Sequence, residues 1–263
     1  MLKLSHISKT FAPGTINAKK ALDDLTLEVA DGEFITIIGS NGAGKSTLFN
    51  AIAGSFLIDS GSIMLGGRDV TLLPEHLRAR KIGRLFQDPL RGTAAGMTIE
   101  ENLMLAAGKG GWFTRMDNKQ RNEFREILSR LNMGLEDRMK QPMGLLSGGQ
   151  RQAVTLLMAT INPPSILLLD EHTAALDPAA ADKVQSITED TVKKEHLTCL
   201  MITHNMRSAL EMGSRTIMME GGRIILDVSG AEREAMTVQD LLDRFREVSG
   251  KAFDNDRMML TTD

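Results

Sequence analysis

The sequence has 263 residues, with 31 Lys and Arg against 34 Asp and Glu and a formal net charge of −3. This near balance argues against a duplex-DNA binder that relies on a broad basic face. The single cysteine, Cys199, excludes a disulfide within the chain, and every apolar run is far shorter than the roughly 18 residues that span a bilayer. We therefore expect a soluble α/β protein of the reducing cytosol.

Strands dominate the beginning of the chain. Residues 2–11 and 21–30 alternate apolar and polar side chains, as half-buried strands do. Residues 33–39 are mostly apolar and predict a buried strand that leads into a helix over residues 45–54. A Gly-Gly pair between strand-like arms predicts two hairpins, at residues 62–70 and 216–228.

Helical patterns replace the strands between about residues 88 and 161. Three helices are predicted there, over residues 98–107, 119–133 and 148–161. Buried parallel strands return at residues 165–171 and 197–204, separated by a helix over residues 178–195. A short helix over residues 237–248 and a polar tail at 249–263 complete the chain, which predicts an α/β core with a helical subdomain inserted at about 88–161.

A phosphate-binding loop is predicted at residues 39–46, where GSNGAGKS fits the pattern G-x-x-x-x-G-K-[ST] between a strand and a helix. Its glycines let backbone N–H groups surround a phosphate. Lys45 would reach the β- and γ-phosphate oxygens, and the Ser46 hydroxyl would ligate Mg²⁺. The predicted strand 165–171 ends in Asp170 and Glu171 at the same edge of the sheet, where Asp170 would hold Mg²⁺ and Glu171 would orient the attacking water.

A second anion-seeking helix start lies at LLSGGQRQ, residues 145–152. Ser147 is a good N-cap, and the glycines leave backbone N–H groups open. Two polar residues, Gln87 and His204, close other predicted strands. Each is either a cap of its strand or a sensor of the γ-phosphate and Mg²⁺, and the phosphate loop in the same sheet favours the second interpretation.

These motifs occur in an order that resembles the nucleotide-binding subunit of ABC transporters: the phosphate loop, Gln87, LSGGQ, ILLLDE, AALD and ITH. The resemblance covers residues 2–248 and implies a P-loop ABC-type fold, with a mixed core sheet, N-terminal antiparallel strands and the inserted helical subdomain. The resemblance also explains why the chain has two predicted anion sites, one at the phosphate loop and one at LSGGQ. In this family two subunits pair head to tail, and each LSGGQ segment closes on the γ-phosphate of the ATP that its partner holds.

The resemblance assigns roles position by position. Phe11 stands where the family has an aromatic residue that stacks on adenine, although a core residue is the alternative. Glu171 matches the catalytic carboxylate, His204 the switch histidine and Gln87 a Mg²⁺-binding hinge of the helical insert. The residues matched to ATP and Mg²⁺ binding are Gly39, Asn41, Gly42, Gly44, Lys45, Ser46, Thr47 and Asp170, with Ser147, Gly148, Gly149, Gln150 and Asp177 acting on the partner's nucleotide.

The partners implied are a second copy of the chain, an integral-membrane permease and, indirectly, a substrate-binding lipoprotein, with no nucleic acid. The segments FQDPLRGTAAGMTIEENL and DEHTAALD are similar to a putative tryptophan/tyrosine-type importer group with a branched-chain-type permease. This similarity implies an importer ATPase on the cytoplasmic face of the membrane, with one ABC ATPase domain over residues 1–248. The alternative is an ABC ATPase without a permease, such as an iron–sulfur-assembly ATPase, because it would carry the same catalytic motifs.

Overall fold

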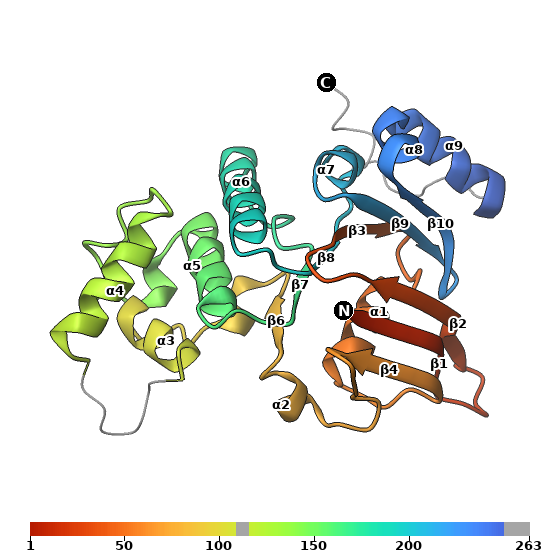
Figure 1. The fold of residues 1–263 in the computed structure, drawn as a ribbon, viewed down its shortest axis with the longest axis horizontal. Helices are drawn as coiled ribbons and strands as arrows, with labels where there is room; N and C mark the ends of the chain where they lie inside the picture. Colours follow the sequence, from red (N-terminus) through yellow and green to blue (C-terminus); the bar gives the residue numbers. More distant parts are fainter. Residues whose placement is uncertain (109–115, 250–263) are drawn as a thin grey trace. The chain divides into compact units, whose positions relative to one another are not determined.

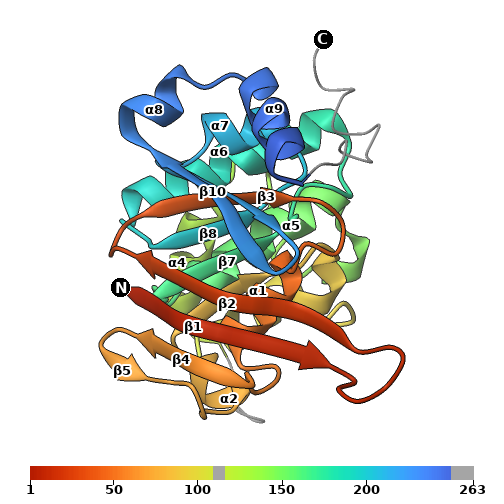
Figure 2. The ribbon, with the colours of Figure 1, turned by 90° about the vertical axis from the view of Figure 1, so that its right-hand side faces the viewer.

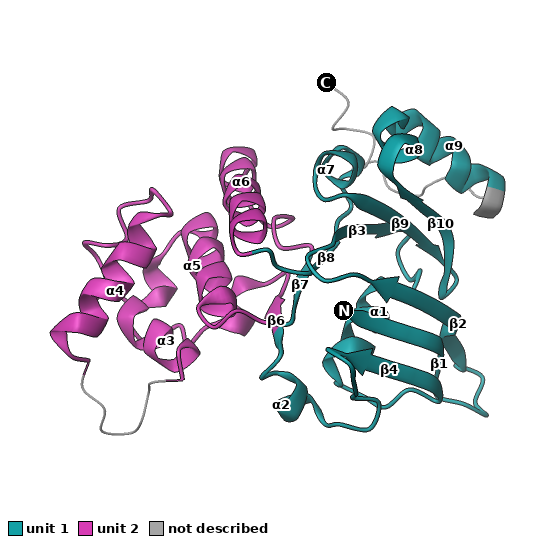
Figure 3. Cartoon of the chain, in the orientation of Figure 1, with its two compact units in different colours: residues 1–82, 165–170, 196–263 teal, residues 83–164, 171–195 magenta. Residues whose placement is uncertain are grey.

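The computed structural model describes residues 1–108 and 116–249 (Figure 1). Its chain divides into two compact units (Figure 3). Unit 1 comprises residues 1–82, 165–170 and the chain from 196 onward, and unit 2 comprises residues 83–164 and 171–195. The tail predicted for residues 249–263 lies, except for its first residue, outside the described part of the chain.

Unit 1 begins with an antiparallel sheet in the order β2-β1-β4-β5 (Figure 2). Its strands confirm the alternating segments and the first Gly-Gly hairpin. The pairing of β1 with β2 is irregular, because His6 and Asp24 both adopt a left-handed φ of 52° and the register shifts there. The register of β1 against β4 also shifts, between Ser5 and Ser8. The strands are β1 (Leu2–Phe11), β2 (Lys19–Val29), β4 (Ser60–Leu65) and β5 (Arg68–Asp69).

The second sheet of unit 1 has β3 (Phe34–Gly39) at its centre. Parallel neighbours flank it on both sides, β8 (Cys199–Ile202) and β9 (Arg215–Glu220). Beyond them, β7 (Ile166–Asp170) pairs in parallel with β8, and β10 (Arg223–Ser229) pairs antiparallel with β9. This mixed sheet confirms the predicted fold class.

Both faces of β3 are covered, which explains why all six of its residues are buried. On one face Ile35 and Ile37 pack in a cluster with Leu48 and Ile52 of α1 (Lys45–Ala53) and with residues of β1 and β2. On the other face Ile38 packs with residues of α7 (Met206–Glu211) and α9 (Val238–Ser249). The phosphate-loop strand is therefore fixed from two sides.

Arg78 is almost fully buried, with 2% of its surface exposed, although it lies in the short helix α2 (Glu75–Arg78). Its guanidinium donates to the carbonyl oxygens of Ala51 and Ile52 at the last turn of α1, at 2.8 and 2.9 Å. It also donates to Thr71 O and Leu73 O, at 2.9 and 2.8 Å. The bond to Ile52 O provides a partner for one of the last carbonyls of α1, and that to Ala51 O adds to the bond from Gly54 N. Burial lowers the pKa of the guanidinium.

Unit 2 contains the three predicted helices of the insert and the helix that follows β7. They are α3 (Ile99–Ala106), α4 (Asn118–Ser129), α5 (Gly148–Thr160) and α6 (Pro178–Lys194), with two 3₁₀ turns, η1 (Pro89–Gly92) and η2 (Met143–Leu145). The sequence pattern placed α6 with the core rather than with the insert, and the contacts group it with the insert. Residues 1–248 as one ATPase domain stay a prediction.

Element ends differ from the sequence expectation in a few places. The helix α4 ends at Ser129, earlier than the predicted residue 133, because Asn132 adopts a left-handed φ of 56° that cannot continue a helix. The strands β6 (Ile82–Leu85) and β8 end two residues before Gln87 and His204, which therefore lie in the following loops. The short helices α2, α7 and α8 (Gly230–Ala235) were not predicted.

None of the helices in residues 1–108 and 116–249 is both long enough and apolar enough to cross a membrane.

Candidate functional site

The phosphate loop in unit 1 has a backbone that only glycine fits at two positions. Gly39 has a φ of 150°, and a Cβ there would lie 2.2 Å from Met219 O. Gly44 has a φ of 105°, and a Cβ there would lie 2.5 Å from Ala21 O. Strands β2 and β9 therefore approach the loop so closely that its shape is fixed before any ligand arrives.

A hairpin backbone supports the same loop. Gly222, between β9 and β10, donates its N–H to Ala43 O at 2.9 Å and accepts from Asp23 N at 3.0 Å. Ser40 Oγ also donates to the Glu220 carboxylate at the end of β9. The predicted hairpin at residues 216–228 thus has a function that the sequence did not indicate, because it braces the phosphate loop.

Lys45 is buried, with 5% of its surface exposed, and its ammonium lies over the loop. Nζ donates to Gly39 O at 2.7 Å and to Ser40 O at 2.9 Å. The positive charge is therefore held against the first two carbonyls of the loop. Asn41, Gly42 and Ser46 are exposed and Thr47 is half-buried, so these residues are accessible from solvent.

The helix α1 begins directly after this loop without a side-chain cap among the described residues. Its N-cap position is Gly44, in a left-handed conformation. The first N–H groups of α1 are thus not satisfied by a capping side chain, and they carry the positive end of the helix dipole. This arrangement favours a bound anion.

Strand register brings Asp170 and His204 to the same edge of the sheet as the loop. Asp170 is paired with Ile202, and Ile202 is paired with Ile37, two residues before Gly39. His204 follows Ile202 by two residues. The predicted convergence of these groups at the carboxyl ends of parallel strands is therefore observed within unit 1.

Phe11 ends β1 and is 40% exposed, so the alternative that it is a core residue is wrong. Its ring meets Phe56 edge to face, with centroids 5.3 Å apart and an interplanar angle of 83°. Lys9 Nζ lies 5.8 Å from the Phe11 centroid and donates to Leu57 O and Asp59 Oδ1 at 2.7 and 2.8 Å. These contacts hold the ring while part of it stays exposed to solvent. The bond from Lys9 lowers the pKa of Asp59.

In unit 2, the helix α5 begins with a complete capping box. Gln150 N donates to Ser147 Oγ, and Ser147 N donates to Gln150 Oε1, both at 3.3 Å. The predicted N-cap is confirmed, and Gln150 is its reciprocal partner. Arg151 then donates to the carbonyls of Met143, Gly144 and Leu146, which fixes the turn that precedes the helix.

The glycines of this helix start allow close packing against α6. A Cβ at Gly149 would lie 2.8 Å from Ala180 Cβ, and one at Gly148 would lie 3.0 Å from the Leu176 side chain. Asp177, which was assigned by resemblance only, is the N-cap of α6, and its Oδ1 accepts from Ala180 N at 3.0 Å. The first turns of α5 and α6 are therefore packed side by side.

Glu171 is half-buried and has a left-handed φ of 48°, a conformation that costs about 1 to 3 kcal/mol for a residue other than glycine. The next residue, His172, is 3% exposed, and its Nε2 lies 3.1 Å from Thr188 Oγ1 of α6. Burial lowers the pKa of His172 to about 4. The turn that carries Glu171 is thus held by a neutral, buried imidazole.

Gln87 is exposed in the loop after β6, and the segment that follows it is fixed by a buried amide. Asn102, 1% exposed, accepts from Ala94 N at 2.8 Å and donates to Ala94 O and Thr98 O at 3.1 and 2.9 Å. This segment pairs with the turn before α5, because Gly144 N donates to Ala95 O at 2.9 Å. The sequence analysis did not identify Asn102, Arg151 or Phe56 as residues that support the site. The one available signal was that Asn102 and Arg151 are polar residues inside predicted helices.

Comparisons with known proteins agree with these motifs. The family described as ABC transporter matches residues 22–174. A tyrosine transport ATP-binding protein of Clostridioides difficile is 40% identical over 93% of this chain and 98% of its own. A thiamine import ATP-binding protein of Salmonella paratyphi A is 36% identical over 76% of this chain and 81% of its own. A dimeric ATP-binding cassette in a post-hydrolysis state, bound to ADP and Pi, superposes with a TM-score of 0.74 at 28% identity, covering 87% of this chain and 98% of that one.

Proposed function

The chain belongs to the ABC transporter family as an ATP-binding subunit that hydrolyses ATP for transport, and from this premise we propose that its homodimer drives a bacterial importer. The observation that carries the proposal is the phosphate loop, which Gly39 and Gly44 shape before α1, a helix start that is open to an anion. The relatives are transport ATPases, so the alternative of an ATPase without a permease is not favoured.

Within the proposal, ATP binds to unit 1. The N–H groups of Asn41, Gly42, Gly44 and their neighbours surround the β-phosphate. The Lys45 ammonium, which now bonds two loop carbonyls, moves to the β- and γ-phosphate oxygens, since a charged acceptor forms a stronger hydrogen bond than a neutral carbonyl. Phe11 offers its exposed face to the adenine ring.

The donor set at the edge of the sheet fits Mg²⁺. In unit 1 the Ser46 hydroxyl and the Asp170 carboxylate are hard oxygen ligands, and Mg²⁺ keeps few protein ligands beside its phosphates. Gln87, which belongs to unit 2, is proposed as a further ligand from the order of the motifs alone. When bound, the ion neutralises negative charge on the phosphates. Among the described residues there is no cluster of three or more His, Cys, Asp or Glu that would favour a different metal site.

Hydrolysis needs a group that orients and deprotonates water. Glu171 is proposed for this function, since it directly follows Asp170 and its left-handed backbone sets it apart from the strand. His204 is proposed to bond the γ-phosphate. Both assignments come from the order of the motifs.

The signature segment is proposed to act on a nucleotide held by a second copy of the chain. Ser147 Oγ accepts from Gln150 N, and its own proton stays available for a phosphate oxygen. Gly148 and Gly149 contribute N–H groups at the same helix start, where Gln150 completes the cap, and Asp177 is proposed to lie in the loop that crosses between subunits. ATP thereby holds the dimer closed, and hydrolysis lets it open.

Transport places the subunit at the membrane, and we propose that it binds the cytoplasmic side of a permease that receives substrate from a lipoprotein. The relative named for tyrosine supports a small aromatic amino acid as the substrate. Purification of the tagged chain from detergent-solubilised native membranes tests this assembly. A multi-span permease and a lipoprotein are the expected partners, and recovery of soluble proteins alone would contradict the importer.

Substitution of Glu171 by Gln tests the catalytic assignment. The variant keeps the size of the side chain and removes the base, so ATP turnover should fall by about 10² to 10⁴. Because ATP binding is retained, ATP and Mg²⁺ should convert the variant to a stable dimer in size-exclusion chromatography.

The matched control is Glu189→Gln, which removes a carboxylate of α6 that pairs with Lys193 at 2.8 Å. We expect wild-type turnover from it. Normal turnover by Glu171→Gln would refute the assignment of Glu171.

A further inference from the structure

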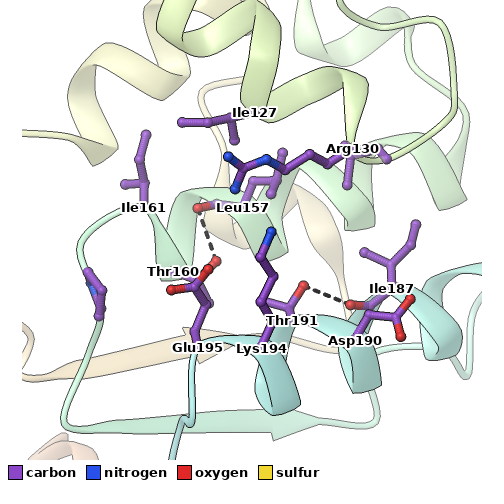
Figure 4. Close-up of a pocket in the computed structure, with 12 residues that line it drawn as sticks. Ile127, Arg130, Leu157, Thr160, Ile161, Ile187, Asp190, Thr191, Lys194 and Glu195 are labelled. Carbon is purple, nitrogen blue, oxygen red and sulfur yellow. Dashed lines mark hydrogen bonds between the residues drawn. The ribbon is translucent and has the colours of Figure 1, made fainter.

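A pocket of about 360 Å³ lies within unit 2 among the C-terminal parts of α4, α5 and α6 (Figure 4). This volume is in the range of small-molecule sites. The proposed ATPase function uses none of the residues that line it. The pocket lies at the opposite ends of α5 and α6 from Ser147 and Asp177, which begin these helices.

The packing of α5 and α6 explains why a cavity exists at this end. Their first turns touch, because Gly149 leaves no room for a side chain against Ala180. Toward their last turns the space between them is lined by Leu157 and Ile161 on one side and Ile187 on the other. No bulky side chain fills it.

One part of the pocket is apolar. Leu157 and Ile187 are each 9% exposed, and Ile127 and Ile161 are half-buried, so all four present hydrocarbon to the cavity (Figure 4). Burying an apolar group of a ligand against such a surface is favourable, because it removes hydrocarbon from water.

Two cations from different helices lie near the middle of the pocket. The Arg130 guanidinium comes from the end of α4 and the Lys194 ammonium from the last turn of α6, and they point toward one another (Figure 4). The one ion pair of Arg130 in the described residues is to Glu126 at 3.4 Å, an exposed contact that contributes little. Lys194 has no ion pair with any residue that the structure describes. Facing like charges repel, and an anion between them reverses the sign of the interaction.

The hydroxyls of the pocket do not compete for this anion. Thr160 Oγ1 donates to Leu156 O at 2.9 Å, and Thr191 Oγ1 donates to Ile187 O at 2.7 Å. Their protons are committed, so each hydroxyl offers lone pairs only. The donors in the pocket are therefore the two cations, while Asp190 and Glu195 add acceptors.

We propose that this pocket binds a small molecule that joins a carboxylate to an apolar group. The carboxylate lies between Arg130 and Lys194, and the apolar group packs on Leu157, Ile161 and Ile187. An amine on the same molecule is compatible with the site, because Asp190 and Glu195 can accept from it. An amine without a carboxylate leaves the repulsion between Arg130 and Lys194 in place and adds a third positive charge, so we expect no binding.

Three probes that share one apolar group test the chemistry: 3-phenylpropionate, L-phenylalanine and phenethylamine. Isothermal titration calorimetry with the full chain, at probe concentrations up to roughly 10 mM, should show saturable binding of the first two and none of the third. The two that bind should also raise the thermal midpoint of the chain, since they bind the folded state.

Lys194→Gln should weaken the binding of 3-phenylpropionate by about tenfold or more, as expected for loss of a charge-assisted hydrogen bond. The matched control is Lys193→Gln, one residue earlier on α6, whose side chain is exposed and pairs with Glu189 instead. Lys194 is itself exposed, so neither change disturbs the core. Equal affinities in the two variants, preference for phenethylamine or no saturable binding by either carboxylate would each overturn the proposal.

Discussion

The two helix starts that we propose as phosphate sites, α1 in unit 1 and α5 in unit 2, are built in opposite ways. The start of α1 is shaped by glycine backbone and has no capping side chain among the described residues. The start of α5 is closed by its own side chains, because Ser147 and Gln150 form a capping box. The first is therefore ready for a phosphate by itself, whereas the second needs none to be stable.

This difference predicts which of the two helix starts determines the affinity for ATP. Uncapped N–H groups gain most from a phosphate, since no internal hydrogen bond is lost. At α5 part of the backbone N–H groups already have hydrogen-bond partners, so a phosphate there should contribute less binding free energy. A weaker contribution is what the proposed contact with the partner's nucleotide requires, since it would form and break in each cycle.

The largest expected effect comes from closing the space that α1 depends on. Gly44→Ala places a Cβ 2.5 Å from Ala21 O at a φ of 105°, and we expect the free energy of unfolding to fall by more than about 3 kcal/mol, with loss of ATP binding. Gly42→Ala is the control. Its Cβ would meet only Lys19 Nζ at 3.2 Å, so it should cost about 1 kcal/mol. Equal stability of the two variants in urea unfolding would show that the loop is not braced by β2.

Acid should act on unit 2 through His172. Its folded pKa of about 4 lies below the ordinary value near 6.5, so between these values the unfolded chain binds a proton that the folded chain refuses. Stability is thus fully present above pH 6.5 and falls as the pH drops to 4, by about 3 kcal/mol at most. Urea unfolding of His172→Gln at pH 7 and pH 4.5 should lose this part of the pH dependence. The control His76→Gln, at an exposed position, should keep it.

A smaller effect is expected where α5 meets α6. Gly149→Ala places a Cβ 2.8 Å from Ala180 Cβ and should separate the two helix starts, at a cost of about 2 kcal/mol in unfolding free energy. Gly148→Ala meets only the flexible end of Leu176 at 3.0 Å and gains helix propensity, so it should be near neutral. ATP turnover should follow the same order, and a more damaging Gly148→Ala would contradict the packing argument.

The smallest effect on stability should come from Ser147→Ala. Loss of the cap costs about 1 kcal/mol. If α1 alone determines affinity, the binding of ATP to monomers should be unchanged, whereas ATP-driven dimers of an otherwise trapped Glu171→Gln chain should weaken. Fluorescent ATP binding and analytical ultracentrifugation separate the two quantities. A drop in monomer affinity would mean that the two starts are less independent than their construction indicates.

The sequence predicted what consecutive residues encode. The strand and helix on either side of the phosphate loop, the Ser147 cap and the long elements all depend on short-range patterns, and the structure contains them. Phosphate binding by the loop stays a prediction. The residues that hold these motifs in place were not predicted, because their signal lies in contacts far along the chain. Arg78 and Asn102 have side chains that usually face solvent, yet both are buried by bonds to backbone carbonyls. Likewise α2 has four residues, too few for a helical period to be visible.

The roles of Gln87, Glu171, Asp177 and His204 stay predictions. The sequence placed His204 at a strand end, and the structure places it two residues later at the same edge of the sheet. Asp177 needed the resemblance, although the pair Asp177-Pro178 also has the form of a helix start with a cap and a first-turn proline. That local pattern was a signal that sequence reasoning did not use.

The bonds of Arg78 determine which substitutions this part of the chain can tolerate. All of its bonds go to main-chain carbonyls, at Ala51, Ile52, Thr71 and Leu73. Those four positions can accept other side chains without losing a single bond, provided the backbone keeps its course. The arginine cannot be exchanged, because lysine lacks the fork of donors that serves four carbonyls at once. Arg78 thus makes no demand on the side chains of its four partners, and those of Ala51 and Ile52 are constrained instead by the core in which both are buried.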